Sequence, residues 1–130
     1  MHGDFMDLYK DLVAASATPL VLSILKEGDS YGYAIIKRVK ELSEEEIKWT
    51  EGMLYPVLHR LEKQGYINSY WQKSPTGRKR KYYSLTQEGG DTLKNIKSQW
   101  RLVNKTLSRT WDKVLCQGLG CQMFCLACWL

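Results

Sequence analysis

Length and charge set the first limits on this chain. It has 130 residues, of which 44% are hydrophobic, and it carries a formal net charge of +5 with a pI of about 9.0. This length fits one domain with a core, and the basic balance favours a polyanionic partner without naming one. No apolar run is long enough to cross a membrane, and the start lacks the form of a secretory signal. We therefore expect a cytoplasmic protein with no membrane span.

Two helices are expected before Gly28. Apolar residues recur at helical spacing over residues 4–17. A second helix over residues 19–27 is expected to begin with Thr18 as its N-cap and Pro19 in its first turn, and Gly28 should end it. We interpret both helices as core and packing surface.

A helix over residues 31–42, capped by Ser30, is expected next. Gly32 lies between two tyrosines, which suggests close packing at that point. The acidic run 43–46 is interpreted as a solvated loop, placed away from any polyanion because it could only repel one. Residues 47–49 alternate like a short strand, and we expect them to form a third strand beside a hairpin.

The stretch from Thr50 to Gly65 predicts a helix with one apolar face, capped at its start by Thr50 and at its end by Gly65. Its apolar side carries Leu54, Val57, Leu58 and Leu61, and its opposite side carries Gly52, Pro56, His59 and Lys63, with Tyr55 and Arg60 at the borders. A helix that hides its leucines and presents small, aromatic and cationic groups suits a major groove. Pro56 either distorts the first turns or indicates a helix that begins nearer Tyr55.

A basic hairpin is expected after this helix. Residues 66–71 and 81–85 alternate with period two, and residues 74–77 between them have the composition of a turn. The tip runs from Lys73 to Arg80, and no acidic residue occurs between Glu62 and Glu88. A merely solvated charge run is the alternative to a DNA contact here. Helix plus basic hairpin is the layout of a winged helix-turn-helix, so we interpret residues 50–85 as a DNA-binding unit.

A long helix is expected to follow, with Thr86 as its cap. Gly89 and Gly90 weaken its start by about 1 kcal/mol each relative to alanine, so tertiary contacts must hold it. Its apolar residues recur at spacings of three and four, as in a heptad seam: Leu93, Ile96, Trp100, Val103, Leu107 and Trp111. So narrow a stripe has little to cover on a monomer, and the predicted partner is the same helix of a second copy.

The tail, residues 116–130, differs in composition from the rest. It contains all four cysteines and no charged residue. The cysteines are spaced too tightly for two ordinary pairs of zinc ligands, and no basic residue nearby would lower a thiol pKa. For these cysteines, apolar packing or a tail that is not native to the protein is favoured over a metal or redox role. We expect neither a metal nor a cofactor.

Four motifs, taken in order, resemble the PadR family of bacterial transcriptional regulators. They are residues 28–36, 51–62, 77–83 and 85–89, and the resemblance covers roughly residues 8–113. It implies a mainly α fold with a small β wing, as in the short-tailed subfamily. The expected parts are a winged helix-turn-helix domain over residues 5–85, a C-terminal dimerisation helix over 86–115 and the atypical tail over 116–130.

The resemblance also implies a function. It predicts a homodimeric repressor that binds an inverted repeat near its own or a neighbouring promoter. Carried onto this sequence, the expected DNA contacts are Tyr31, Tyr55, His59, Arg60 and Lys63, with Lys73, Arg78, Lys79 and Arg80 on the wing. For His59, an ordinary surface histidine is the alternative.

A ligand site is implied as well. Within the family, a lactococcal multidrug-sensing member stacks planar drugs on a tryptophan of its C-terminal helix, in a pore at the dimer axis. Trp100 is similar in position, and Asn104 follows four residues later. Two tryptophans facing each other across a two-fold axis could leave a slot for a flat aromatic ligand. Packing of Trp100 in the dimer seam is the alternative.

Two other classes of function compete with a regulator. A winged helix can serve as a protein-interaction module without DNA readout, although such modules usually have a neutral or acidic wing. An enzyme is the weakest interpretation, because no serine, cysteine or carboxylate is spaced to complete a nucleophilic set with His59.

Overall fold

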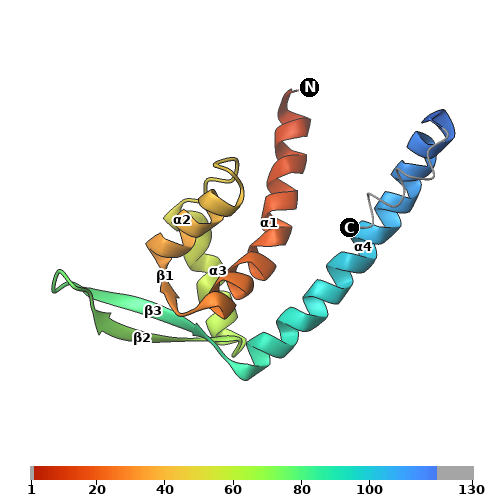
Figure 1. Ribbon diagram of the computed structural model, residues 1–130. Helices are drawn as coiled ribbons and strands as arrows, with labels where there is room; N and C mark the ends of the chain where they lie inside the picture. Colours follow the sequence, from red (N-terminus) through yellow and green to blue (C-terminus); the bar gives the residue numbers. More distant parts are fainter. Residues whose placement is uncertain (1, 120–130) are drawn as a thin grey trace. The chain divides into compact units, whose positions relative to one another are not determined.

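The computed structural model describes the backbone of residues 2–119 and the side chains of residues 9–111. Its elements are α1 (His2–Glu27), β1 (Ser30–Tyr31), α2 (Gly32–Leu42), α3 (Glu51–Lys63), β2 (Ile67–Lys73), β3 (Lys79–Leu85) and α4 (Gln87–Leu119), as labelled in Figure 1. The chain forms two compact units, one reaching Lys94 and one starting at Asn95. The predicted fold class, mainly helical with a small β wing, is confirmed.

The three strands form one antiparallel sheet in the order β1-β3-β2. Figure 1 shows the hairpin of β2 and β3 projecting from the first three helices, with its turn at the far end. The prediction of a third strand at residues 47–49 was wrong. The edge of β3 away from β2 is paired with Ser30 and Tyr31, and Trp49 is buried by core packing rather than by strand pairing.

Residues His2–Glu27 form one continuous helix, α1, so the prediction of two helices was wrong. Pro19 lies inside the helix, where it lacks the N–H that would bond to the carbonyl four residues before it. Thr18 does not cap a new helix, because its hydroxyl accepts a hydrogen bond from Arg60 Nη2 of α3 at 2.8 Å. Val21 and Leu22 are fully buried after the proline, and this packing offsets the lost bond.

Helix α2 begins one residue later than predicted. Its N-cap is Tyr31, which makes no side-chain capping bond, and Ser30 lies in β1 instead of capping the helix. Pairing of Ser30 with Tyr83 and of Tyr31 with Tyr82 holds both residues in extended conformation. The sheet, rather than a serine cap, therefore fixes where α2 starts.

Both predicted ends of α3 are confirmed. The Thr50 side chain accepts a hydrogen bond from the Met53 N–H at 3.3 Å, and the helix starts at Glu51, so Pro56 lies within it. At the other end Gly65 has a φ of +82°, a conformation that glycine adopts without strain. The bond from Tyr66 N to Leu61 O, 3.0 Å long, closes the helix as a Schellman motif.

The start of α4 depends on a close approach between backbones. Thr86 caps it by accepting a hydrogen bond from Gly89 N at 3.0 Å, as predicted. The Thr86 hydroxyl also donates to the Gly65 carbonyl at 2.7 Å. A Cβ at Gly89 would lie 2.0 Å from the carbonyl oxygen of Tyr66, so no larger residue fits without a shift. These are the tertiary contacts that the weak helix start required.

The core of the first unit lies between its helices and the base of the sheet. Helix α3 buries Leu54, Leu58 and Leu61, as predicted, and Val57 is half-buried. The other fully buried side chains come from α1, α2, β2 and the start of α4: Val21, Leu22, Ile35, Val39, Ile67 and Leu93.

Candidate nucleic-acid interface

The outward face of α3 carries the side chains that the sequence placed there. His59 and Lys63 are exposed, and Tyr55 is 46% exposed. Among the described residues, neither His59 nor Lys63 has a hydrogen bond or ion pair. The buried leucines on the opposite side of α3 fix the helix in the core. The polar groups of its outward face therefore have a fixed position and remain available for an external partner.

The wing tip is a tight turn with cations on both sides. Gly77 has a φ of +88°, its N–H donates to Ser74 O at 2.9 Å, and Ser74 N donates to Arg78 O at 2.7 Å. The predicted turn is thus confirmed. Lys73, Arg78 and Lys79 are exposed, and within the described part of the chain none of them has a partner. The turn therefore presents three uncommitted positive charges at the end of the hairpin.

Three other cations near this surface are held by the chain itself. Arg60 is bonded to Thr18 of α1, and Lys81 Nζ lies 4.0 Å from Glu62 Oε2 of α3. The Arg80 guanidinium lies 4.5 Å from the ring centroid of Tyr31. The predicted DNA contacts therefore divide into residues that are free and residues already engaged within the fold.

A row of three tyrosines crosses the sheet at the base of the wing, and the sequence analysis missed it. Tyr31, Tyr82 and Tyr70 occupy paired positions on β1, β3 and β2. Tyr82 meets Tyr31 edge to face at 5.3 Å and stacks on Tyr70 at 5.7 Å. The Tyr70 hydroxyl donates to Asp29 Oδ2 at 2.8 Å, and this bond raises the pKa of Tyr70. The register across the hairpin could have placed Tyr70 opposite Tyr82 from sequence, but Tyr31 joins the row through β1, which the sequence did not predict.

The predicted close packing at Gly32 involves α3. Gly32 is buried, and a Cβ there would lie 3.1 Å from the Tyr55 hydroxyl oxygen. Tyr55 thus bridges α3 and the first residue of α2, while nearly half of its surface stays exposed. The small residue at position 32 lets the two helices meet at this point.

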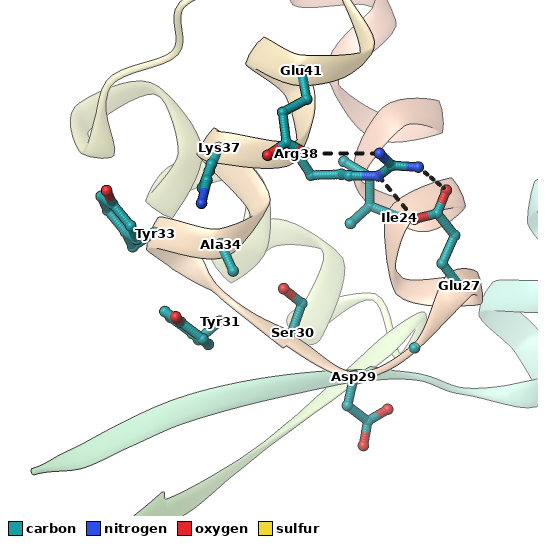
Figure 2. Close-up of a pocket in the computed structure, with 11 residues that line it drawn as sticks. Ile24, Glu27, Asp29, Ser30, Tyr31, Tyr33, Ala34, Lys37, Arg38 and Glu41 are labelled. Atoms are coloured by element: carbon teal, nitrogen blue, oxygen red, sulfur yellow. Dashed lines mark hydrogen bonds and ion pairs between the residues drawn. The ribbon is translucent and has the colours of Figure 1, made fainter. Parts of the chain in front are cut away.

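A groove of about 440 Å³ lies between the end of α1 and the start of α2 (Figure 2). On one side Arg38 Nε bonds to Glu27 at 3.1 Å, and its guanidinium lies 3.7 Å from Glu41, which together raise the pKa of Arg38. Tyr33 and Lys37 line the other side and are exposed. Arg38 is thus engaged with both Glu27 and Glu41 on this side of the groove.

Helix α4 leaves most of its apolar stripe uncovered. Trp100, Val103, Leu107 and Trp111 are 42–59% exposed, and Ile96 is half-buried. Asn104 is exposed one turn beyond Trp100. Leu93 differs, because it is only 1% exposed and belongs to the core of the first unit.

The described residues contain neither a metal-binding cluster nor a membrane-spanning helix. No group of three or more histidine, cysteine, aspartate or glutamate side chains is placed to hold a metal ion there. No helix in that part of the chain is both long and apolar enough to span a membrane. The side chains of the cysteine-rich tail, residues 116–130, lie outside the described residues.

Comparison with known proteins agrees with this geometry. Residues 21–95 match the model of the transcriptional regulator PadR-like family. A crystal structure of a PadR family transcription regulator from Clostridium difficile R20291 is 39% identical, covers 74% of this chain and 98% of its own, and has a TM-score of 0.66. A PadR family regulator from Eggerthella lenta is 31% identical, covers 85% and 96%, and has a TM-score of 0.71. The transcriptional regulator YqjI of Escherichia coli is 27% identical over 88 residues, which span only 41% of its length.

The fold and the exposed basic surface define a winged-helix DNA-binding regulator of transcription. The chain belongs to the PadR-like family, whose model matches more than half of it.

Proposed function

We propose that the chain is a homodimeric repressor that binds an inverted-repeat operator and is released by a small planar aromatic ligand at the dimer interface. The observation that carries the proposal is the surface formed by the outward face of α3 and the wing tip. Its cations have no partner within the described chain, whereas nearby cations are paired.

We assign the DNA contacts to side chains that have no partner among the described residues, and a supporting role to those that have one. Tyr55, His59 and Lys63 enter the major groove with α3, which is firmly held by its buried leucines. Lys73, Arg78 and Lys79 neutralise phosphates beside the adjacent minor groove. Tyr31, Arg60 and Arg80 are engaged within the fold and act mainly by holding α3 and the wing in position.

The dimer is supported by α4. Four large apolar side chains on one stripe of the helix, from Trp100 to Trp111, are at least 42% exposed. Pairing with the same stripe of a second copy would bury them, as in a coiled coil. We leave Leu93 out of this seam because the chain's own core contains it. Two α3 helices about 34 Å apart would then meet successive major-groove faces.

The ligand site is proposed at Trp100 and Asn104. The two residues are four positions apart and therefore share a face of α4. A tryptophan from each copy could stack on a flat aromatic molecule, and Asn104 could bond to its polar edge. Binding would change the angle between the two winged domains, and a coupling of roughly 1–3 kcal/mol would suffice for release.

A mobility-shift assay with DNA from upstream of the chain's own reading frame tests the proposal. We expect a shift that weakens as salt rises and that needs a much higher protein concentration when Arg78 and Lys79 are both changed to alanine. The matched control, Lys10→Ala with Lys40→Ala, removes the same charge from exposed lysines of α1 and α2 and should leave the shift nearly intact. Absence of any shift at low salt would instead favour a protein-interaction module.

A further inference from the structure

The side chains on one face of the wing contact other groups of the protein, whereas several on the other face are exposed and have no partner among the described residues. Side chains of adjacent strand residues point to opposite faces, so the register assigns each residue to one of them. The face with Tyr70, Tyr82, Gln72 and Arg80 is called the tyrosine face here, and the face with Trp71, Lys73, Lys79 and Lys81 is called the tryptophan face.

The tyrosine face is committed to contacts within the protein. The Tyr82 ring contacts the rings of both Tyr70 and Tyr31, and the Tyr70 hydroxyl is bonded to Asp29. The cation of Arg80 lies over the ring of Tyr31. The carboxylate of Asp29 would also repel a phosphate approaching from this side. This face is therefore suited to fixing the direction of the wing.

The tryptophan face presents its groups to the outside. Trp71 is 66% exposed, and within the described residues its ring has no aromatic or cation partner. Lys81 is its register partner, and Lys73 is paired with Lys79 one step nearer the tip. An exposed tryptophan next to the cations of Lys73 and Lys79, which are unpaired in the described part of the chain, combines a large apolar surface with positive charge, while Lys81 is paired with Glu62.

The tryptophan face is also the face on which α3 lies. Glu62 of α3 accepts a hydrogen bond from Ser69 at 2.5 Å and lies 4.0 Å from Lys81 Nζ. Ser69 and Lys81 both belong to that face. A duplex seated against the outward face of α3 would therefore continue toward Trp71 rather than toward the tyrosine row.

We propose that Trp71 is a DNA contact, with its indole packed on the deoxyribose rings that line the groove beside the wing. Lys73 and Lys79, which have no partner among the described residues, would neutralise the flanking phosphates. The ring itself carries no charge, so it would add contact area and position without adding to the salt dependence. This inference rests on the proposed function, since it names a further part of the same DNA-binding surface.

The test compares Trp71→Ala and Trp71→Phe with a control on the opposite face, Gln72→Ala. Operator affinity is measured by fluorescence anisotropy over a range of salt concentrations. We expect Trp71→Ala to weaken binding about tenfold, the effect of a residue that carries part of an interface. For Trp71→Ala, the slope of log affinity against log salt should equal that of the unaltered protein. The affinity of Trp71→Phe should lie between those of Trp71→Ala and the unaltered protein. Gln72→Ala should bind with the affinity of the unaltered protein.

A second readout excludes an indirect effect of the substitution on folding. In the unaltered protein labelled with ¹⁵N, the indole N–H signal of Trp71, assigned by its loss in Trp71→Phe, should shift when the same duplex is added. If the protein binds DNA but this signal is unmoved and Trp71→Ala binds normally, the inference is overturned and the proposed function stands. If the unaltered protein binds no DNA at low salt, both fail.

Discussion

Helices α3 and α4 have similar amphipathic patterns and opposite surroundings. The apolar face of α3 is buried by its own chain, with Leu54, Leu58 and Leu61 at most 1% exposed. The apolar stripe of α4 remains uncovered from Trp100 to Trp111. A stripe of leucines thus does not by itself indicate which kind of partner a helix has.

The difference bears on how each helix can act. Because the apolar side of α3 is buried in the core, only its outward polar face is available to contact a ligand such as DNA. Because the apolar stripe of α4 is exposed, it is the part of this helix that can pack against a partner. We propose that the partner is the same helix of a second copy. Four predictions, ordered from the largest expected effect to the smallest, test this contrast and the packing of the first unit.

Shortening Leu58 to alanine should reduce the free energy of unfolding by about 2–5 kcal/mol, the usual effect of emptying a core site. Leu58 is fully buried within the first unit. Denaturant unfolding should give the same loss at low and high protein concentration. A loss that grew with dilution would mean that α3 is stabilised by a partner rather than by its own chain.

Changing Leu107 to aspartate should weaken the dimer about a hundredfold or more, because a charge would enter an apolar seam. Sedimentation equilibrium would measure the change. Ser98→Asp is the matched control, since Ser98 lies on the opposite side of α4 from Trp100. Equal association of the two variants would show that the exposed stripe is not the seam.

The start of α4, within the first unit, can be tested with two neighbouring glycines. Gly89→Ala should destabilise the first unit by about 1–3 kcal/mol through overpacking, since its Cβ would collide with the Tyr66 carbonyl. Gly90→Ala meets only Leu85 Cδ2 at 3.9 Å and should be neutral or slightly stabilising. Thermal or denaturant unfolding of the pair measures the difference. Similar stabilities would contradict the close approach at Gly89.

Alkaline pH should weaken the first unit slightly. Burial, assisted by the charge of Glu62, raises the pKa of Tyr83 above its ordinary value of about 10. The folded state therefore favours the neutral phenol. Its contribution is complete below pH about 10 and is lost as pH rises through the raised pKa. Unfolding midpoints against pH should show this loss in the unaltered protein and less of it in Tyr83→Phe; identical profiles would contradict it.

The sequence predicted the elements whose signals are local. Thr50 and Thr86 are caps, Gly65 and Gly77 have positive φ, and the leucines of α3 are buried, all as expected. Each of these depends on a residue's chemistry within one turn of the chain.

The sequence misled where distant contacts override local rules. Pro19 did not start a helix, because α1 is held by burial on both sides of it. Ser30 did not cap α2, because β3 pairs with it. The commitment of Arg60 to Thr18 and of Arg80 to Tyr31 likewise depends on residues more than forty positions away, and only the fold brings them together.

The most direct test of the central claim, that two wings and two α3 helices bind DNA together, is the salt dependence of operator affinity. In a dimer, Arg78→Ala with Lys79→Ala removes four phosphate contacts, so the slope of log affinity against log salt should become shallower by about 3.6, at roughly 0.9 per contact. Fluorescence anisotropy with the unaltered protein and the double variant measures both slopes. A slope that the double variant leaves unchanged would contradict the account.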